Sequence, residues 1–361
     1  MLTKGDDFPL HQTPEPVAYA GTDRNFYDRY FFNGYAPDGS GFFALAFGIY
    51  PHLNVADAHF SITRDGVQHT LHASRELGME RFDLTCGPIR IEIVEPLQIL
   101  RVTVSGEGIS AELTFTGRAF PIEEPRFTHR IGPRTFMDYT RLTQNGRYTG
   151  WIEVDGQRDA LHPATVGTRD RSWGVRPVGA RDEQPHGADV VPGFFWQWTP
   201  LNFAERSVFF HINADARGEA WNTRAVIAPD GGGVGSQFET TDASMTAALN
   251  SGTRWPGEGL IELDTPEGTD RIRLEPVGRF QMRGIGYTSP TWGHGLWHGP
   301  LAVEREAIVL AECDPARMDN YHVQLPCRAF SERYGEGFGV FEQLILGPYA
   351  PLGLKEFLDL G

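Results

Sequence analysis

Lysine is almost absent from the sequence, and long apolar runs are missing. Among the 361 residues only Lys4 and Lys355, close to the two ends, are lysine, which strongly disfavours a buried Schiff-base lysine and pyridoxal chemistry. The longest apolar run, near residues 42–50, is much shorter than the roughly 18 residues of a membrane-spanning helix. Residues 1–16 are polar and lack the apolar region of a signal peptide. We therefore expect a cytoplasmic protein without a membrane span.

Cysteine and clustered positive charge are also scarce. The three cysteines, Cys86, Cys313 and Cys327, are odd in number and widely spaced, which argues against a disulfide framework and a thiolate zinc site. The net charge is 32 − 47 = −15, and no stretch of clustered Lys or Arg offers the footprint that a phosphate backbone selects. Nucleic acid is therefore not expected as a partner.

Glycine, proline and aromatic residues are abundant instead. The chain has 42 Gly and 25 Pro together with 40% hydrophobic residues, so turns are numerous and the segments between them must pack. Short alternating segments bounded by Gly, Asp and Pro predict antiparallel strands. Asp65-Gly66 and Asp155-Gly156 supply the positive φ angle that hairpin turns need. The sequence thus predicts a mainly β protein.

The same pattern places individual elements. A three-stranded meander is predicted over residues 89–95, 98–105 and 109–117. Further strands are predicted at 194–199, 207–213, 223–228, 259–263, 270–275, 305–313 and 339–346. Only 23–30 and 242–250, each opening with an acidic cap candidate, are predicted as short helices.

A turn-rich passage over residues 178–192 and a hairpin ending near residue 161 predict a domain junction. We expect an N-terminal β domain over 1–160 and a C-terminal β domain over 161–361. Two closed antiparallel barrels are the economical arrangement, because closure removes exposed sheet edges. A barrel of about eight strands also leaves room for one small ligand.

The segment over residues 166–177 is the densest in functional side chains. Arg169, Asp170, Arg171, Trp173 and Arg176 fall within eight residues. If the segment is a regular strand, Trp173 shares a face with Arg169 and Arg171, and Asp170 points to the other face. Asp170 is then either an ionised partner of neighbouring arginines or a proton donor, and arginine neighbours favour the first role because they lower a carboxyl pKa.

The string Arg-Asp-x-Ser-Trp-Gly-x-Arg resembles the signature of the carotenoid 1,2-hydratase (hydroxyneurosporene synthase) superfamily. That superfamily includes kievitone-hydratase-like, tocopherol-cyclase-like and fungal Diels-Alderase-like proteins. Segments 32–39, 48–59 and 337–347 extend the resemblance along nearly the whole chain. It implies two lipocalin-like (calycin) antiparallel β-barrel domains and a hydratase or cyclase activity. The hydratases often have His where this chain has Arg171, which removes one candidate proton-transfer group.

Hydration of an isolated alkene proceeds through a carbocation and needs an acid that can protonate carbon. A carboxylic acid in a dry pocket has a raised pKa and can supply that proton. Aromatic faces stabilise the cation by about 0.5 to 2 kcal/mol each. Phe194, Trp196 and Trp198 alternate along a predicted strand and share one face, which fits either a cavity wall or core packing.

A second group of polar residues lies at Asp57, His59 and Ser61. Period-two spacing puts the three on one face of a strand, which fits either a site or an ordinary solvated face. Isolated candidates, each of which also fits a structural role, are His129, Tyr139, His211 and Glu342.

Two histidine-rich or glycine-rich stretches are not expected to bind metal or phosphate. Residues 293–299 hold two histidines four apart, but three glycines in seven residues disfavour the helix that would align them for zinc. Residues 231–235 lack the Lys-Ser/Thr ending of a phosphate loop and predict a hairpin tip. We expect no cofactor and no metal.

The sequence favours a cofactor-independent lyase or isomerase that hydrates, dehydrates or cyclises a hydrophobic, isoprenoid-like or polycyclic substrate. The alternatives are a lipocalin-like carrier that binds a hydrophobic small molecule without turnover and a purely structural domain. The oligomeric state is left open. The assigned roles are proton donor for Asp170 or Asp57, base for His59 or His129, substrate contact for Phe194, Trp196, Trp198, Trp173, Tyr139 and His211, and structural support for Arg169 and Arg176.

Overall fold

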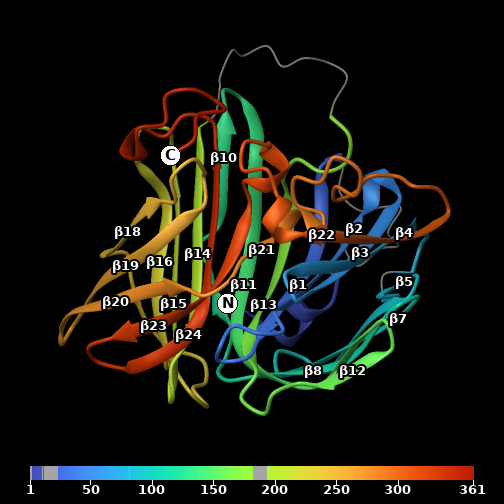
Figure 1. Cartoon of the computed structure of the whole chain (residues 1–361), viewed down its shortest axis with the longest axis horizontal. Helices are drawn as coiled ribbons and strands as arrows, with labels where there is room; N and C mark the ends of the chain where they lie inside the picture. The colour runs from blue at the N-terminus through green and yellow to red at the C-terminus, as the bar shows by residue number, and fades with distance from the viewer. Residues whose placement is uncertain (1, 10, 12–22, 81, 182–192) are drawn as a thin grey trace.

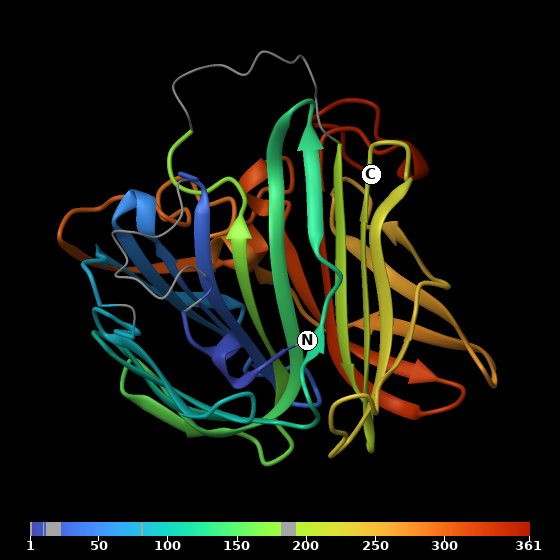
Figure 2. The ribbon, with the colours of Figure 1, turned by 180° about the vertical axis from the view of Figure 1, so that it is seen from behind.

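The described part of the chain is built almost wholly of β-strands. The computed structural model describes residues 2–9, 11, 23–80, 82–181 and 193–361. Within these residues the strands form two antiparallel sheets, each curled into a barrel or half-barrel, that lie side by side (Figure 1, Figure 2). The predicted mainly β fold with two lipocalin-like units is confirmed.

The first sheet contains most of the N-terminal strands. Three short strands pair with its long strand β11 outside the main path: β9 (Ile122–Glu123), β10 (Phe127–Ile131) and β12 (Gln157–Ala160). The main path runs β22 (Leu301–Val309), β4 (Val67–Glu76), β3 (Val55–Arg64), β2 (Phe43–Tyr50), β1 (Phe26–Tyr35), β13 (Val166–Val175), β11 (Arg134–Val154), β8 (Ile109–Gly117), β7 (Ile99–Gly106), β6 (Ile89–Glu95) and β5 (Thr85–Cys86).

The second sheet contains the C-terminal strands. Its path runs β17 (Phe238–Thr240), β16 (Ala220–Pro229), β15 (Arg206–Ala214), β14 (Phe194–Asn202), β24 (Gly335–Leu346), β23 (Val323–Ser331), β20 (Gly268–Pro276), β19 (Pro256–Thr265) and β18 (Ala243–Leu249), with β21 (Phe280–Gln281) beside β23. Short 3-10 turns complete the described elements: η1 (Lys4–Asp7), η3 (Pro51–Leu53), η4 (Met282–Ile285), η5 (Leu310–Glu312), η6 (Met318–Asn320) and η7 (Ala350–Leu352).

The hairpins and the meander lie where the sequence predicts them. Asp65 and Gly66 have φ angles of 49° and 77° at the turn between β3 and β4, and Asp155 and Gly156 have 51° and 80° between β11 and β12. Strands β6, β7 and β8 pair consecutively. The Asp-Gly turns therefore determine which neighbouring strands pair, because only a few residue types adopt a positive φ angle at low cost.

Both predicted helices are wrong. Residues 26–30 of the first belong to β1, which is buried along almost its whole length between β2 and β13. Residues 243–249 of the second form β18, whose residues alternate between half-buried and exposed as the edge partner of β19. Tertiary pairing outweighed the local preference in both segments, as is usual for short stretches of mixed propensity.

Two strands from beyond residue 160 belong to the first sheet. β13 lies between β1 and β11, and β22 pairs with β4 at the far edge. Residues 305–309 are therefore a strand as predicted, while 310–312 form η5. The described chain enters the second sheet only at β14, and the domain boundary near residue 160 stays a prediction.

Buried apolar side chains occupy three zones. One fills the interior of the first sheet and includes Phe43, Phe60 and Leu100. Another fills the interior of the second sheet and includes Phe210 and Ile261. Between the sheets lies a third zone, made of side chains from the facing surfaces of β1, β2, β14 and β15. The two sheets are therefore packed against each other through a core of their own.

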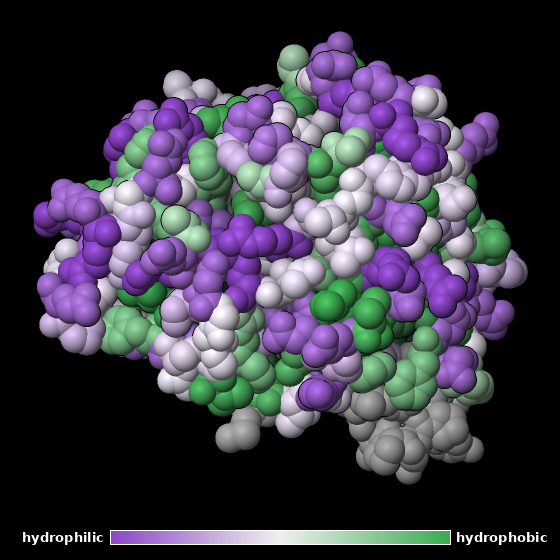
Figure 3. All heavy atoms as spheres, turned by 90° about the horizontal axis from the view of Figure 1, so that it is seen from below, coloured by the Kyte–Doolittle hydropathy of each residue, from purple (hydrophilic) through white to green (hydrophobic). Residues whose placement is uncertain are grey.

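Hydrogen bonds join the sheets across this third zone. Arg118 donates to the Asn202 side chain (3.1 Å) and to the Phe203 carbonyl (2.6 Å), and Asn33 donates to Gln324 (3.0 Å). The outer surface seen from below is largely hydrophilic (Figure 3). In the described ranges, no helix combines the length and the apolar character needed to cross a bilayer.

Candidate functional site

A cavity of about 770 Å³ opens between the two sheets. Its walls come from β10, β11 and the segment after β13 on one side, and from β14 and β24 on the other; a loop over residues 286–296 completes it. We expected the ligand space inside one barrel. This cavity lies between the sheets instead. Apolar side chains pack inside the first sheet, whereas the second sheet has an apolar core and a further hollow of about 550 Å³ lined by Phe195, Gln197 and Met245.

Aromatic side chains form one wall of the cavity. Phe194 and Trp196 of β14 line it together with Tyr139 of β11, whose ring stacks on that of Phe127 at 4.6 Å. Trp198 shares the face of Trp196, as predicted, but is only 1% exposed and packs against Phe31 in the core between the sheets. Trp196 therefore forms part of a cavity wall, and Trp198 packs in the core.

Glu342 of β24 is fixed at the cavity by three donors. Its carboxylate accepts hydrogen bonds from Trp196 Nε1 (2.7 Å), His322 Nε2 (2.8 Å) and Gln324 Nε2 (2.5 Å). Burial raises the pKa of Glu342, but these donors outweigh burial and hold it below its usual value. Glu342 is consequently an anchored carboxylate and a poor proton donor.

Arg141 of β11 is likewise held in place. Two of its nitrogens donate to the two oxygens of Glu124, at 2.8 and 2.6 Å. Its guanidinium carbon lies 4.6 Å from the centre of the Trp196 ring. His211 Nδ1 is 3.5 Å from Glu124, and burial lowers the pKa of His211 to about 4, so this imidazole is neutral near pH 7.

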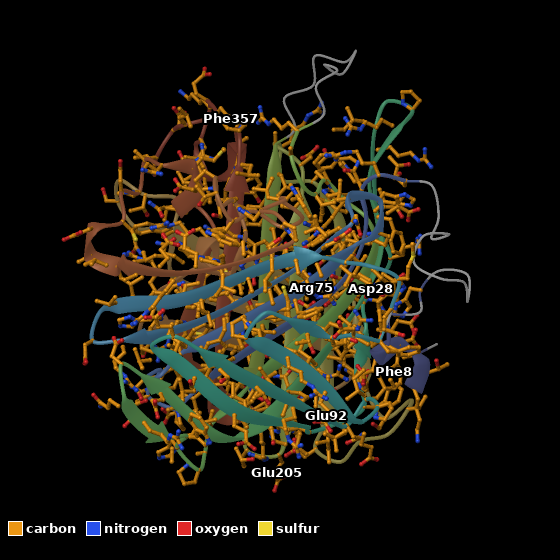
Figure 4. The ribbon with its side chains drawn as sticks, turned by 90° about the vertical axis from the view of Figure 1, so that its right-hand side faces the viewer. Phe8, Asp28, Arg75, Glu92, Glu205 and Phe357 are labelled. Carbon is orange, nitrogen blue, oxygen red and sulfur yellow. The ribbon has the colours of Figure 1, made fainter. Side chains whose placement is uncertain are left out.

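The two arginines beside Asp170 point away from it. Arg169 pairs with Asp7 and donates to Gln144 (2.7 Å), and Arg171 pairs with Asp28. Arg171 also donates to the Phe8 carbonyl (2.9 Å), so its partners lie on the side of the first sheet shown in Figure 4. The predicted alternation along β13 is present, and neither flanking arginine forms an ion pair with Asp170.

Asp170 is buried without an ion-pair partner in the described part of the chain. It is 5% exposed, and its Oδ1 atom has no hydrogen-bond partner. Burial raises the pKa of Asp170 from 3.8 to about 6, against the opposing charges of Arg141 and Arg29. The carboxyl does not itself line the cavity, but it interacts electrostatically with the lining residues Arg141, Tyr287 and Glu342.

Close backbone approach explains the two glycines around Asp170. Gly174 has a φ angle of 137°, and a Cβ atom there would lie 2.4 Å from the Asp138 carbonyl oxygen. A Cβ atom at Gly167 would lie 2.0 Å from the Asn33 carbonyl oxygen. Larger residues would push β13 away from β11 or β1 and displace Asp170 with it.

Arg29 of β1 connects two groups of the 286–296 loop. It donates to His294 Nδ1 (2.9 Å) and to the Tyr287 hydroxyl oxygen. Because Arg29 can only donate, His294 Nδ1 is the acceptor and Nε2 carries the proton that it shares with the Ile285 carbonyl (2.8 Å). Burial and the nearby Arg29 charge lower the pKa of His294 well below its usual value, which agrees with this neutral tautomer.

Asp57 and His59 lie behind that loop and do not line the cavity. Asp57 accepts from Tyr50 (3.1 Å) and from the Gly295 amide (2.6 Å). His59 Nδ1 is 2.9 Å from His72 Nδ1, and His59 Nε2 is buried without a hydrogen-bond partner among the described residues. The structure therefore brings this predicted pair together but places it apart from the cavity lining.

The remaining predicted residues are spread over two places, the cavity and the opposite face of β13. His129 lies at the cavity, stacked on Trp221 at 5.0 Å, and burial lowers its pKa. Trp173 is on the opposite face of β13, stacked on His11 at 3.6 Å. Arg176 lines the cavity, whereas Arg169, the other arginine assigned to structural support, does not.

Metal ligands are not grouped in the part of the chain that the structure describes. No three His, Cys, Asp or Glu side chains there are arranged to hold an ion. The residues 293–299 form no helix, as predicted, and His298 stacks on Trp292 at 4.0 Å while His294 bonds Ile285.

Residues 2–355 match the model of a family described as a family of unknown function, DUF8625. The chain belongs to this family. No curated protein sequence matches it.

Solved structures share the fold of this family member at low sequence identity. The AttH-like protein NE1406 of Nitrosomonas europaea is 12% identical, with 93% of this chain and 98% of that chain covered and a TM-score of 0.58. CghA with Sch210972 is 11% identical, with 94% and 96% covered and a TM-score of 0.52. Kievitone hydratase from Nectria haematococca is 12% identical, with 88% of each chain covered and a TM-score of 0.48. The first two of these structures confirm the resemblance drawn from the sequence for the fold.

Several residues at the cavity were missed by the sequence analysis. Glu124, Arg141, Tyr287 and His322 come from separate segments with no motif spacing, whereas His294 lies in the glycine-rich 293–299 stretch that the sequence singles out. One signal was available: Arg141 stands opposite Ser172 in the register between β11 and β13. A correct pairing of those two strands would have placed a positive charge beside Asp170.

Proposed function

We propose that the protein is a cofactor-independent lyase or isomerase that transfers protons on a hydrophobic, isoprenoid-like or polycyclic substrate bound in this cavity. Asp170 carries the proposal. Its pKa of about 6 lets both the acid and the carboxylate form be populated near neutral pH, which suits a group that gives and takes protons. The aromatic wall at Phe194 and Trp196 supports an apolar substrate.

The charges around the cavity favour a reaction that develops negative rather than positive charge. Arg141 and Arg176 line the cavity and Arg29 lies beside Tyr287, so a free carbocation would face three guanidinium groups. The Trp196 ring is a candidate to stabilise a cation, but the guanidinium carbon of Arg141 already lies 4.6 Å from its centre. We therefore favour addition or loss of water, or double-bond migration, next to a carbonyl group, where charge builds up on oxygen.

Tyr287 is suited to stabilise that oxygen. It lines the cavity, and its hydroxyl oxygen accepts a hydrogen bond from Arg29, which leaves the hydroxyl proton free to be donated to a substrate. In this proposal the reacting carbon lies in the cavity beside Arg141 and Tyr287, and Asp170, which lies behind the lining, exchanges the proton at that carbon through one bridging water. The neutral imidazole of His129, at the cavity, is the candidate base for water.

The test is hydrogen exchange in heavy water. A panel of isoprenoid and polycyclic enones and β-hydroxy ketones is incubated with the protein in D₂O and analysed by mass spectrometry for deuterium next to the carbonyl and for gain or loss of water. Asp170→Asn should lower the rate at least about 100-fold, the usual size of a general acid–base contribution. Asp57→Asn removes a second buried carboxyl outside the cavity lining and should leave the rate within about threefold.

A carrier without turnover is the second candidate, because the Asp170 carboxyl does not line the cavity. Compounds that bind but return without deuterium would support the carrier and reject the enzyme. Exchange that survives in Asp170→Asn but disappears in Asp57→Asn would instead move the proton donor to the group behind the loop.

A further inference from the structure

Among the residues that the structure describes, Arg176 differs from Arg141 in having no acidic partner. It follows β13 and lines the cavity, where its guanidinium carbon is 4.5 Å from the centre of the Tyr27 ring and 5.7 Å from that of Tyr287. Across the described ranges its guanidinium forms no ion pair and donates no hydrogen bond. Arg141, by contrast, is bound through two nitrogens by Glu124.

A second guanidinium adds to the positive charge at this end of the cavity. Arg29 lies 4.6 Å from the centre of the same Tyr287 ring. The nearby carboxylate of Glu342 is already bound by three donors, and the His294 imidazole is neutral. Two guanidinium groups, those of Arg176 and Arg29, thus lie at this end of the cavity, and the carboxylate of Glu342 already has its own hydrogen-bond donors.

We propose that Arg176 binds the carboxylate of an otherwise apolar ligand. The inference rests on the proposed function, because it assigns the ligand to the same cavity, and it narrows the substrate class to hydrophobic carboxylic acids. A planar guanidinium fits a carboxylate, whose two oxygens accept parallel N–H bonds. The apolar body of the ligand would then lie along Phe194 and Leu344, which also line the cavity.

The test compares abietic acid, a tricyclic isoprenoid carboxylate, with its methyl ester. Each compound displaces the neutral dye 1-aminoanthracene from the purified full-length protein, and the loss of dye fluorescence gives its dissociation constant. The acid should bind at least about tenfold more tightly than the ester, as expected of hydrogen bonds between charged groups. In Arg176→Met the two constants should agree within about twofold.

Two further variants keep the result interpretable. Arg101→Met removes the same charge from an exposed position on β7, paired with Glu92, and should keep the tenfold preference. Arg176→Lys keeps the charge but loses the two-pronged donor, so the preference for the acid over the ester should fall to a few-fold. This variant tests the inference if Arg176→Met does not fold.

The outcomes separate this inference from the proposed function. Equal binding of acid and ester by the unaltered protein would overturn the role of Arg176 while leaving a cavity that binds apolar molecules. A tenfold preference that persists in Arg176→Met would overturn it as well. No binding of the dye or of either compound would overturn the inference and the proposed function together.

Discussion

The two faces of β13 have opposite electrostatic surroundings. On one face, inside the first sheet, Arg169 forms an ion pair with Asp7 and Arg171 forms one with Asp28. On the other face Asp170 is buried between the sheets without an ion-pair partner among the described residues. Burial acts on both acids, but Arg171 and His11 hold the pKa of Asp28 below 3.8, whereas the pKa of Asp170 rises to about 6.

The ion-paired face of β13 therefore supports the fold, whereas the other face carries the candidate catalytic group. A satisfied buried ion pair fixes a single arrangement and leaves no group free to titrate near neutral pH. An unpaired buried carboxyl costs stability when it ionises, and such a cost persists where it serves a function. Period-two alternation assigns these two tasks to neighbouring residues.

The largest effect should come from breaking the paired face. Arg171→Met removes the partner of Asp28 and leaves a buried carboxylate with only His11 against it. The free energy of unfolding should fall by about 3 to 5 kcal/mol, the cost of an uncompensated buried charge. Urea denaturation followed by tryptophan fluorescence measures this value.

The double variant Arg171→Met with Asp28→Asn is the matched control. It removes both charges, so much of the lost stability should return. A loss below about 1 kcal/mol in the single variant would mean that water reaches this pair, and the contrast between the two faces of β13 would then disappear.

The second effect depends on pH and tests the unpaired face. The pKa of Asp170 in the folded protein, about 6, lies above the ordinary value of 3.8, so the folded state binds the proton more tightly. Its contribution to stability is therefore complete at low pH and is lost as the pH rises from about 4 to 6. Above pH 6 the ionised carboxylate costs about 3 kcal/mol.

Asp170→Asn should remove that cost. The stability of the variant relative to the unaltered protein should increase by about 2 to 2.5 kcal/mol between pH 4 and pH 7, measured by urea denaturation of both proteins at each pH. A difference that does not vary with pH would show that nearby arginines hold Asp170 ionised, and its role as proton donor would be rejected.

Local features of the fold could be predicted because each depends on a few adjacent residues. The Asp-Gly turns and the alternation around Asp170 follow from φ preferences and from the period of a strand. The segments at 26–35 and 243–249 could not be predicted, because their strand state depends on pairing with distant neighbours. The placement of β22 beside β4 depends on a crossover of the same kind.

The candidate site was predictable only where one segment contains it. Asp170 and Arg176 lie in one dense motif, and Trp196 lies in an alternating aromatic stripe. Arg141 is placed near the motif by the register of β11 with β13, whereas Glu342 belongs to the other sheet and reaches the cavity only through the packing of the two sheets. The alternation predicts that Asp170 points away from its adjacent arginines, but whether a residue of another strand pairs with it could not be predicted, because that depends on the packing of distant segments.

The smallest effect compares two tryptophans on the two sides of the first sheet. Trp196 lines the cavity, while Trp173 stacks on His11 on the opposite face of β13. Trp196→Phe removes part of the apolar wall and the N–H donor to Glu342, so displacement of 1-aminoanthracene by methyl abietate should weaken by about three- to tenfold. Trp173→Phe makes the same chemical change and should leave the dissociation constant within about twofold. Equal weakening by both would mean that the ligand is not bound between the sheets, because no position there touches both side chains.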